Sequence, residues 1–140
     1  MATATIRNLL IALAVIIGFC AGWLRHSKPE NAIARFAKHV KKTISAATLQ
    51  TWVTNYLSTA ADGPTTNLNL PNAMLRISIE QQPDIWTLRS GSGVQYLDFA
   101  YGGGFAHWGL AVGPTNFVLT PSDDRYVLDW VPGIYFWHER

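Results

Sequence analysis

The stretch VQYLDFAYGGGFAHWGLAV, Val94–Val112, indicates two β-strands that meet at a run of three glycines. Apolar side chains recur at every second position in both halves, and successive side chains of a strand point to opposite faces of a sheet. Glycine accepts the positive φ angles of a tight turn, so we expect a hairpin with its tip at the glycines. The predicted apolar faces carry Leu97, Phe99 and Tyr101 in the first strand and Trp108, Leu110 and Val112 in the second.

The glycine run has a second interpretation, because consecutive backbone N–H groups can form a concavity that holds an anion. No Lys-Ser or Lys-Thr pair follows the glycines, which excludes a Walker loop. A dinucleotide fingerprint needs a helix after the glycines, and the pattern that follows is that of a strand. We therefore expect a structural hairpin.

Turn residues recur between short apolar runs on both sides of this hairpin, which predicts an antiparallel meander. Upstream, Leu75, Ile77 and Ile79 alternate with polar residues. Downstream, a strand with Tyr126, Leu128 and Trp130 on one face is expected. The remaining expected strands are DIWTLRS after Pro83, FVLT at 117–120 and IYFW at 134–137, and the turns between strands include GSG at 91–93, GPTN at 113–116 and PSDD at 121–124.

The sequence before the strands has a helical period. Ser27 and Glu30 have the spacing of a capping box, with Pro29 in the first turn. A second helical pattern follows, and it is either separated by a break near 43–48, with Ser45 or Thr48 as cap, or continuous from about Glu30 to Ala60. ADGP at 61–64 is expected to end it. The apolar stripe, which packs either on the same domain or on a membrane or partner, consists of Ile33, Phe36, Val40, Ile44 and Ala47.

These patterns together predict an α+β protein in which helices precede and cover a small antiparallel sheet. We expect a membrane anchor at residues 1–26, an amphipathic helical segment at 27–62 and an antiparallel β domain at 63–140.

The anchor is predicted from Leu9–Leu24, which carries no charged residue. As a helix this run is about 24 Å long, slightly short of the bilayer core, and flanking residues extend it. A cleaved signal and a buried soluble helix are the alternatives, and Phe19 before Cys20 argues against a lipoprotein signal. The residues expected in lipid are Leu9, Leu10, Ile11, Leu13, Val15, Ile16, Ile17, Phe19, Trp23 and Leu24.

Charge is unevenly distributed along the chain. Hydrophobic residues make up 49% of the sequence and charged residues only 14%, which is low for a soluble domain. A basic cluster follows the apolar run, and the remainder is mildly acidic. Basic residues beside a bilayer are drawn to anionic lipid headgroups, so we expect membrane lipids rather than nucleic acid as their partner. The residues expected at headgroups are Arg25, Lys28, Arg35, Lys38, Lys41 and Lys42.

The two flanks of the anchor disagree about its orientation. A short N-terminal tail with Arg7 favours export of the C-terminal domain, whereas the larger basic flank favours the cytoplasm. We expect a single-pass protein with an extracytoplasmic domain.

No catalytic, cofactor or metal site is predicted. None of the histidines, His26, His39, His107 and His138, has a partner at metal-ligand spacing. An acid–base pair of His107 and Asp98 remains a hypothesis for a membrane-anchored enzyme. Aromatic residues dominate protein interfaces, although they equally form cores in small domains. The candidate partner-binding residues are Trp130, Ile134, Tyr135, Phe136 and Trp137.

The favoured function is therefore that of a non-catalytic, single-pass accessory or assembly subunit that binds other proteins. The alternative is a filament subunit, because an apolar N-terminal helix, an amphipathic continuation and a C-terminal antiparallel sheet resemble the layout of type IV pilins and pseudopilins. The family's processing motif, a glycine and Phe with a Glu at the fifth mature position, is absent, since Gly18-Phe19 leads into Cys20.

Overall fold

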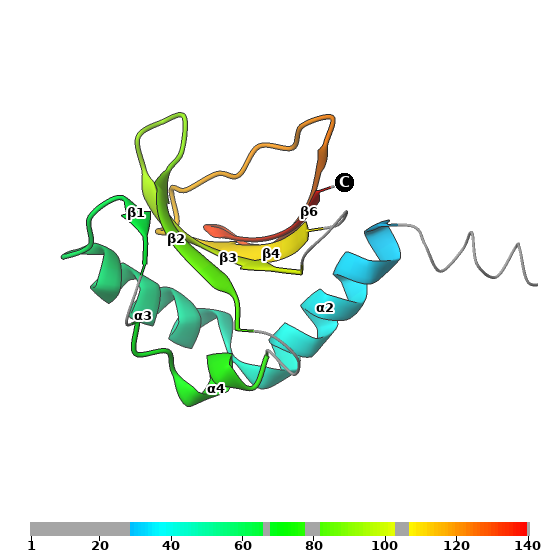
Figure 1. Ribbon diagram of the computed structural model, residues 1–140, viewed down its shortest axis with the longest axis horizontal. Coiled ribbons are helices and arrows are strands. Elements are labelled where there is room, and N and C mark those ends of the chain that lie inside the picture. Colours follow the sequence, from blue (N-terminus) through cyan, green and yellow to red (C-terminus); the bar gives the residue numbers. More distant parts are fainter. Residues whose placement is uncertain (1–28, 66–67, 78–81, 103–106, 140) are drawn as a thin grey trace, which may run out of the picture. The chain divides into compact units, whose positions relative to one another are not determined.

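The computed structural model describes residues 29–65, 68–77, 82–102 and 107–139. The chain divides into two compact units, Met1–Ala32 and Ile33–Arg140, and the second unit contains nearly all described residues. Its two longer helices precede an antiparallel sheet, which confirms the α+β class (Figure 1). None of the described helices is both long and apolar enough to cross a bilayer. The expected anchor, residues 1–26, and the expected cap Ser27 lie outside the described residues.

The sheet has six strands in the order β1-β2-β3-β4-β6-β5, and every neighbouring pair is antiparallel. The predicted alternation of faces in the two central strands is confirmed, because Phe99 pairs with Leu110 and Tyr101 with Trp108. The glycines at 103–104 lie outside the described residues. The strands are β1 (Gly63–Pro64), β2 (Asp84–Arg89), β3 (Gln95–Tyr101), β4 (His107–Val112), β5 (Arg125–Val131) and β6 (Ile134–Glu139).

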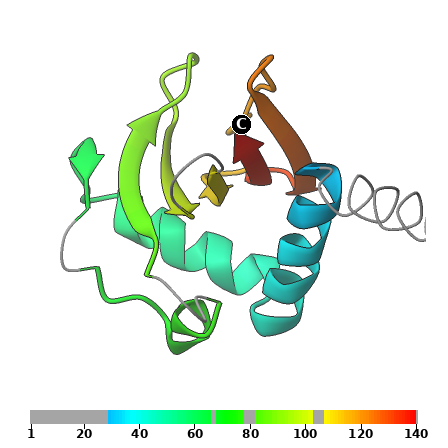
Figure 2. The ribbon, with the colours of Figure 1, turned by 45° about the vertical axis from the view of Figure 1, so that its right-hand side comes forward.

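The simple meander predicted from the turn spacing is wrong at its last step. β4 pairs with β6 rather than β5, so β6 lies between its two neighbours and β5 forms the edge (Figure 2). A tight turn at Pro132–Gly133 sends the chain back along the inner side of β5, and Gly133 adopts the positive φ of 87° that this turn requires.

The first helix, α2 (Pro29–Thr43), is amphipathic. Ile33, Val40 and Ile44 are almost completely buried in the apolar cluster formed by the helices and the sheet. The interpretation in which this stripe packs on its own domain is therefore confirmed for these residues. The inclusion of Ala47 in the stripe is wrong, because Ala47 belongs to the next helix and is exposed. The opposite side of the helix is left to charged side chains.

The second helix, α3 (Ala46–Leu57), is separated from α2 by a break, as one of the two sequence interpretations predicted. Ser45 is its N-cap, and the Ser45 hydroxyl accepts a hydrogen bond from the Thr48 amide at 3.1 Å. The helix ends earlier than expected. Gly63 and Pro64 do not terminate it but form β1, opposite Thr87 and Trp86 of β2.

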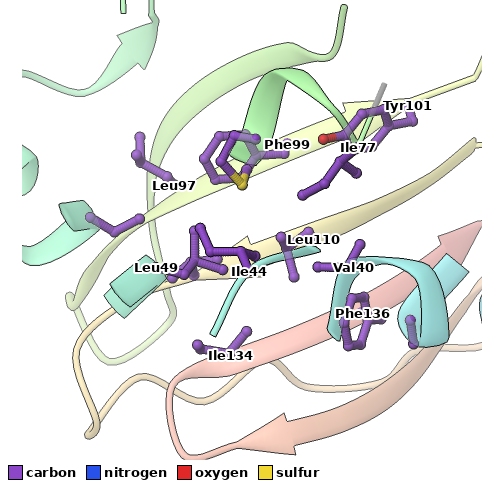
Figure 3. Packing of buried hydrophobic residues seen from close by; sticks show 14 of the residues in the cluster. Val40, Ile44, Leu49, Ile77, Leu97, Phe99, Tyr101, Leu110, Ile134 and Phe136 are labelled. Carbon is purple, nitrogen blue, oxygen red and sulfur yellow. The ribbon is translucent and has the colours of Figure 1, made fainter. Parts of the chain in front are cut away.

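One face of the sheet, here called the helix face, packs against α2, α3 and the short helix α4 (Asn72–Leu75). Figure 3 shows side chains from the helices and from β3, β4 and β6 directed toward one another in this cluster. The strand predicted around Leu75 is wrong, since Leu75 ends α4 and is half exposed, whereas Met74 and Ile77 enter the core. Residues 78–81 lie outside the described residues.

The opposite face of the sheet, the loop face, is covered by the segment between β4 and β5, which crosses it on the side away from the helices (Figure 1). The strand predicted at 117–120 is absent. Instead Phe117 stacks on Tyr96 with ring centroids 4.3 Å apart, and Tyr135 donates a hydrogen bond to the Phe117 carbonyl at 3.0 Å. Phe117 and Leu119 alternate in burial because they cap a second apolar cluster, which explains the strand-like pattern.

Candidate protein-binding surface

The aromatic C-terminal strand proposed as a partner surface is core in this structure. Ile134 and Phe136 are fully buried against the helices, and Trp137 is 3% exposed on the loop face. Tyr135 is also buried, and Trp130 is partly buried beside Phe136. Both faces of this strand find their cover inside the chain, as the alternative interpretation of these aromatics allowed. These residues therefore do not form an exposed surface that a partner could contact.

Trp137 lies across the loop face instead of projecting from it. Its indole occupies the space above Gly109, where a Cβ atom would overlap the ring and come within 2.5 Å of the Phe99 carbonyl oxygen. This absence of a side chain lets the indole reach the next strand but one, where its Nε1 donates a hydrogen bond to Oδ1 of Asp98 at 2.6 Å. Gly109 thus leaves room for the Trp137 indole, whose N–H donates a hydrogen bond to the buried carboxylate of Asp98.

The buried, ionised carboxylate of Asp98 lowers the stability of the fold. It is only 9% exposed, and desolvation raises the pKa of its carboxyl to about 6, although the Trp137 hydrogen bond and the charge of Arg125 oppose the rise. Arg125 is held by Glu139, with its Nε 2.6 Å from Oε1, and its guanidinium lies 5.3 Å from the Trp137 ring centroid. Arg125 is therefore directed to another carboxylate.

Trp86, unlike Asp98, is exposed on the loop face. It lies directly opposite Asp98 in the register of β2 and β3, and it is 43% exposed on the same face. Directly opposite residues of antiparallel strands have Cβ atoms about 5 Å apart. Asp84 precedes Trp86 by two residues, so it lies on the same face, and it is exposed. We call Asp84, Trp86 and Asp98 the β2 patch.

The β2 patch combines an accessible indole with one exposed carboxylate, Asp84, and one buried carboxylate, Asp98. An indole face attracts cations, and carboxylates accept charge-assisted hydrogen bonds from Lys or Arg. The arrangement suits an apolar segment that carries a basic side chain. Sequence reasoning missed this patch because Trp86 looked like any other aromatic residue in a strand, and only the register placed Asp98 beside it.

The hypothetical acid–base pair of His107 and Asp98 is not brought together. Asp98 pairs with Ala111, and His107 lies four residues before Ala111 on β4, which corresponds to about 13 Å along the strand. His107 is exposed, and in the strand register it lies opposite Glu139 of β6. Among the residues that the structure describes, no group of three or more His, Cys, Asp or Glu side chains is arranged to hold a metal ion.

The expected headgroup-binding residues separate into two groups. Arg35, Lys38 and Lys42 are exposed at helical spacing on the side of α2 opposite its buried stripe, and we call them the α2 basic face. Lys41 is exposed too, but its ammonium lies 5.7 Å from the Trp130 ring centroid and 5.6 Å from that of Phe136. It therefore helps to fix α2 against the sheet. Arg25 and Lys28 lie outside the described residues.

The sheet edges offer little backbone for another chain to pair with. β1 has two residues, and its Pro64 has no N–H to donate. On β5, both backbone groups of Arg125 bond to Ser122, and a bulge interrupts the strand between Asp129 and Val131. Such features are typical protections of exposed edges. The edges therefore do not favour the addition of a strand from another chain.

Comparison with protein-family models, with curated proteins and with solved structures found no match.

Proposed function

We propose that this chain is a non-catalytic, single-pass membrane protein whose α+β unit is an accessory subunit that binds another protein through the β2 patch. The uncharged run Leu9–Leu24 supports the membrane anchor. The proposal also places the α+β unit on the extracytoplasmic side, on the basis of the short N-terminal flank. Protease accessibility in sealed cells and in opened ones tests this sidedness.

The exposure of Trp86 is the observation that carries the binding role. The fold buries large aromatics on both faces of the sheet, yet it leaves 43% of Trp86 at the surface, beside a carboxylate whose burial destabilises the fold. Tryptophans in such positions are enriched among the residues that dominate binding energy at protein interfaces. A Lys or Arg from the partner would contact the indole and the exposed carboxylate of Asp84 together.

Affinity purification of the full chain from detergent-solubilised membranes tests the proposal. We expect a second protein to co-purify with the wild-type chain and to be lost from Trp86→Ala, because truncating a central interface tryptophan typically costs about 2 kcal/mol or more of binding energy. Tyr126→Ala is the matched control, since Tyr126 is 41% exposed but lies on the helix face of β5. That variant should retain the partner.

Four results would count against the proposal. Recovery of the chain alone as a monomer would remove the binding role, and recovery of long homopolymers would favour the filament-subunit alternative. Equal partner recovery with Trp86→Ala and Tyr126→Ala would show that the partner does not bind at the β2 patch. Fractionation of the intact chain as a soluble protein without detergent would remove the membrane anchor.

A further inference from the structure

The exposed acids of the second unit lie outside α2 and α3, whereas α2 carries several exposed bases. The exposed bases of α2 are Arg35, Lys38, Lys41 and Lys42, and no acidic residue occurs between Ile33 and Leu57. The exposed acids lie instead on the strands and loops, and they include Asp62, Asp84, Asp123, Asp124 and Asp129. An anionic surface would therefore attract α2 and repel most of the remaining unit.

The apolar stripe of α2 is already used by the core, so it is not available for insertion into lipid. Val40 and Ile33 are at most 1% exposed because the sheet covers them. Lys41 is committed to the Trp130 and Phe136 rings. What α2 offers to a partner is therefore a purely electrostatic face, formed by Arg35, Lys38 and Lys42.

We propose that the α2 basic face docks on the anionic phospholipid surface of the membrane, so that the helix side of the unit lies against the bilayer and the loop face points away from it. This deepens the proposed function and rests on its membrane attachment, and it requires anionic lipid in the leaflet that faces the unit. The occupant is assigned to lipid because the uncharged run Leu9–Leu24 stands only a few residues before α2 in the sequence. A short linker keeps the basic face at high effective concentration beside headgroups.

The orientation has a consequence for the β2 patch. Trp86 and Asp98 are on the loop face, on the opposite side of the sheet from the helices. Docking through α2 would hold the β2 patch outward, where a partner protein can reach it. Lipid and partner would then bind at the same time on opposite sides of one sheet.

Energy transfer from the full-length chain to a fluorescent lipid tests this docking. The chain, with Cys20 replaced by serine, carries a dye at Ala34→Cys beside the basic face or at Val118→Cys on the loop face, and is reconstituted in vesicles of phosphatidylcholine with or without phosphatidylserine. We expect phosphatidylserine to bring the dye at position 34 toward the lipid and to leave the dye at 118 remote. High salt should reverse the effect, because exposed charges are screened.

Charge reversal supplies the matched comparison. Each basic residue near an anionic surface strengthens binding about fivefold, so Lys38→Glu, which changes two charge units, should weaken docking about 25-fold. Asp123→Lys changes two charge units at an exposed turn between β4 and β5, away from the helices, and should leave the transfer unchanged. Equal transfer in both vesicle types, or equal effects of the two reversals, would overturn the proposal. Co-purification of nucleic acid that is lost only in Lys38→Glu would assign the face to nucleic acid and also overturn it.

The same preparations separate this inference from the proposed function. Loss of lipid docking with normal Trp86-dependent partner recovery would refute only the lipid assignment. Normal docking without any recovered partner would refute only the role as a protein-binding subunit.

Discussion

Replacing Asp98 by asparagine should stabilise this protein at neutral pH. Asparagine retains an oxygen that accepts the hydrogen bond from Nε1 of Trp137, and it has no charge to desolvate. In the folded chain the pKa of Asp98 is raised from 3.8 to about 6, mainly by burial. The ionised carboxylate is therefore less stable in the fold than in the unfolded chain.

The size and sign of the effect follow from this pKa difference. Between about pH 4 and pH 6 the native protein holds a proton that the unfolded chain has released, so the free energy of unfolding falls as pH rises through this window. A pKa difference of about two units corresponds to about 3 kcal/mol, all of which is lost above pH 6. Asp98→Asn should recover up to about 3 kcal/mol at pH 8 and little at pH 4.

Urea unfolding of the detergent-solubilised chain, followed by tryptophan fluorescence from pH 4 to pH 8, measures this difference. Subtracting the variant's curve from the wild-type curve removes the contribution of other titrating groups. Asp123→Asn, at an exposed turn, should follow the wild type at every pH. If Asp98→Asn is no more stable than the wild type at pH 8, or if the difference does not change with pH, the assigned cost of burying Asp98 is wrong.

Three further substitutions and one control substitution test the packing of the loop face by urea unfolding of the full chain. Gly109→Ala should cost about 1–3 kcal/mol or more because a Cβ overlaps the indole and a backbone carbonyl, whereas Gly91→Ala, where a Cβ meets nothing within 4 Å, should change stability by less than about 0.5 kcal/mol. Tyr135→Phe should cost about 1–2 kcal/mol, since the Phe117 carbonyl loses its donor. Phe117→Ala should cost about 3–5 kcal/mol, and a smaller loss than that of Tyr135→Phe would show that the loop does not cover the sheet.

Local patterns predicted the elements whose burial follows a simple period. The stripe from Ile33 to Ile44 has the spacing of a helix with one buried side, and the structure buries that side against the sheet. Ser45 has a preference for helix N-caps strong enough to mark the break before α3. The alternation around Phe99 predicted both a strand and its faces, because each face of β3 meets a different apolar cluster.

The failures arise where a pattern has two physical causes. Phe117 and Leu119 are buried at alternate positions because a loop presses them onto the sheet, which one sequence cannot distinguish from strand pleating. The order of the strands could not be predicted from the sequence either, because a local turn signal does not indicate on which side of β5 the next strand pairs. The β2 patch depends on that tertiary information too, because Trp86 and Asp98 meet only through the register of two strands.

The position of β6 has a consequence for how the protein is made. It is the last of the described strands to leave the ribosome, yet it fills the gap between β4 and β5. Until β6 emerges, β4 and β5 of the nascent chain expose the backbone N–H and C=O groups that later bond to β6. Intermediates with unpaired strand edges tend to aggregate or to recruit chaperones. The sheet therefore closes only after β6 has emerged, and the tight turn at Pro132–Gly133 brings this strand into place beside β5.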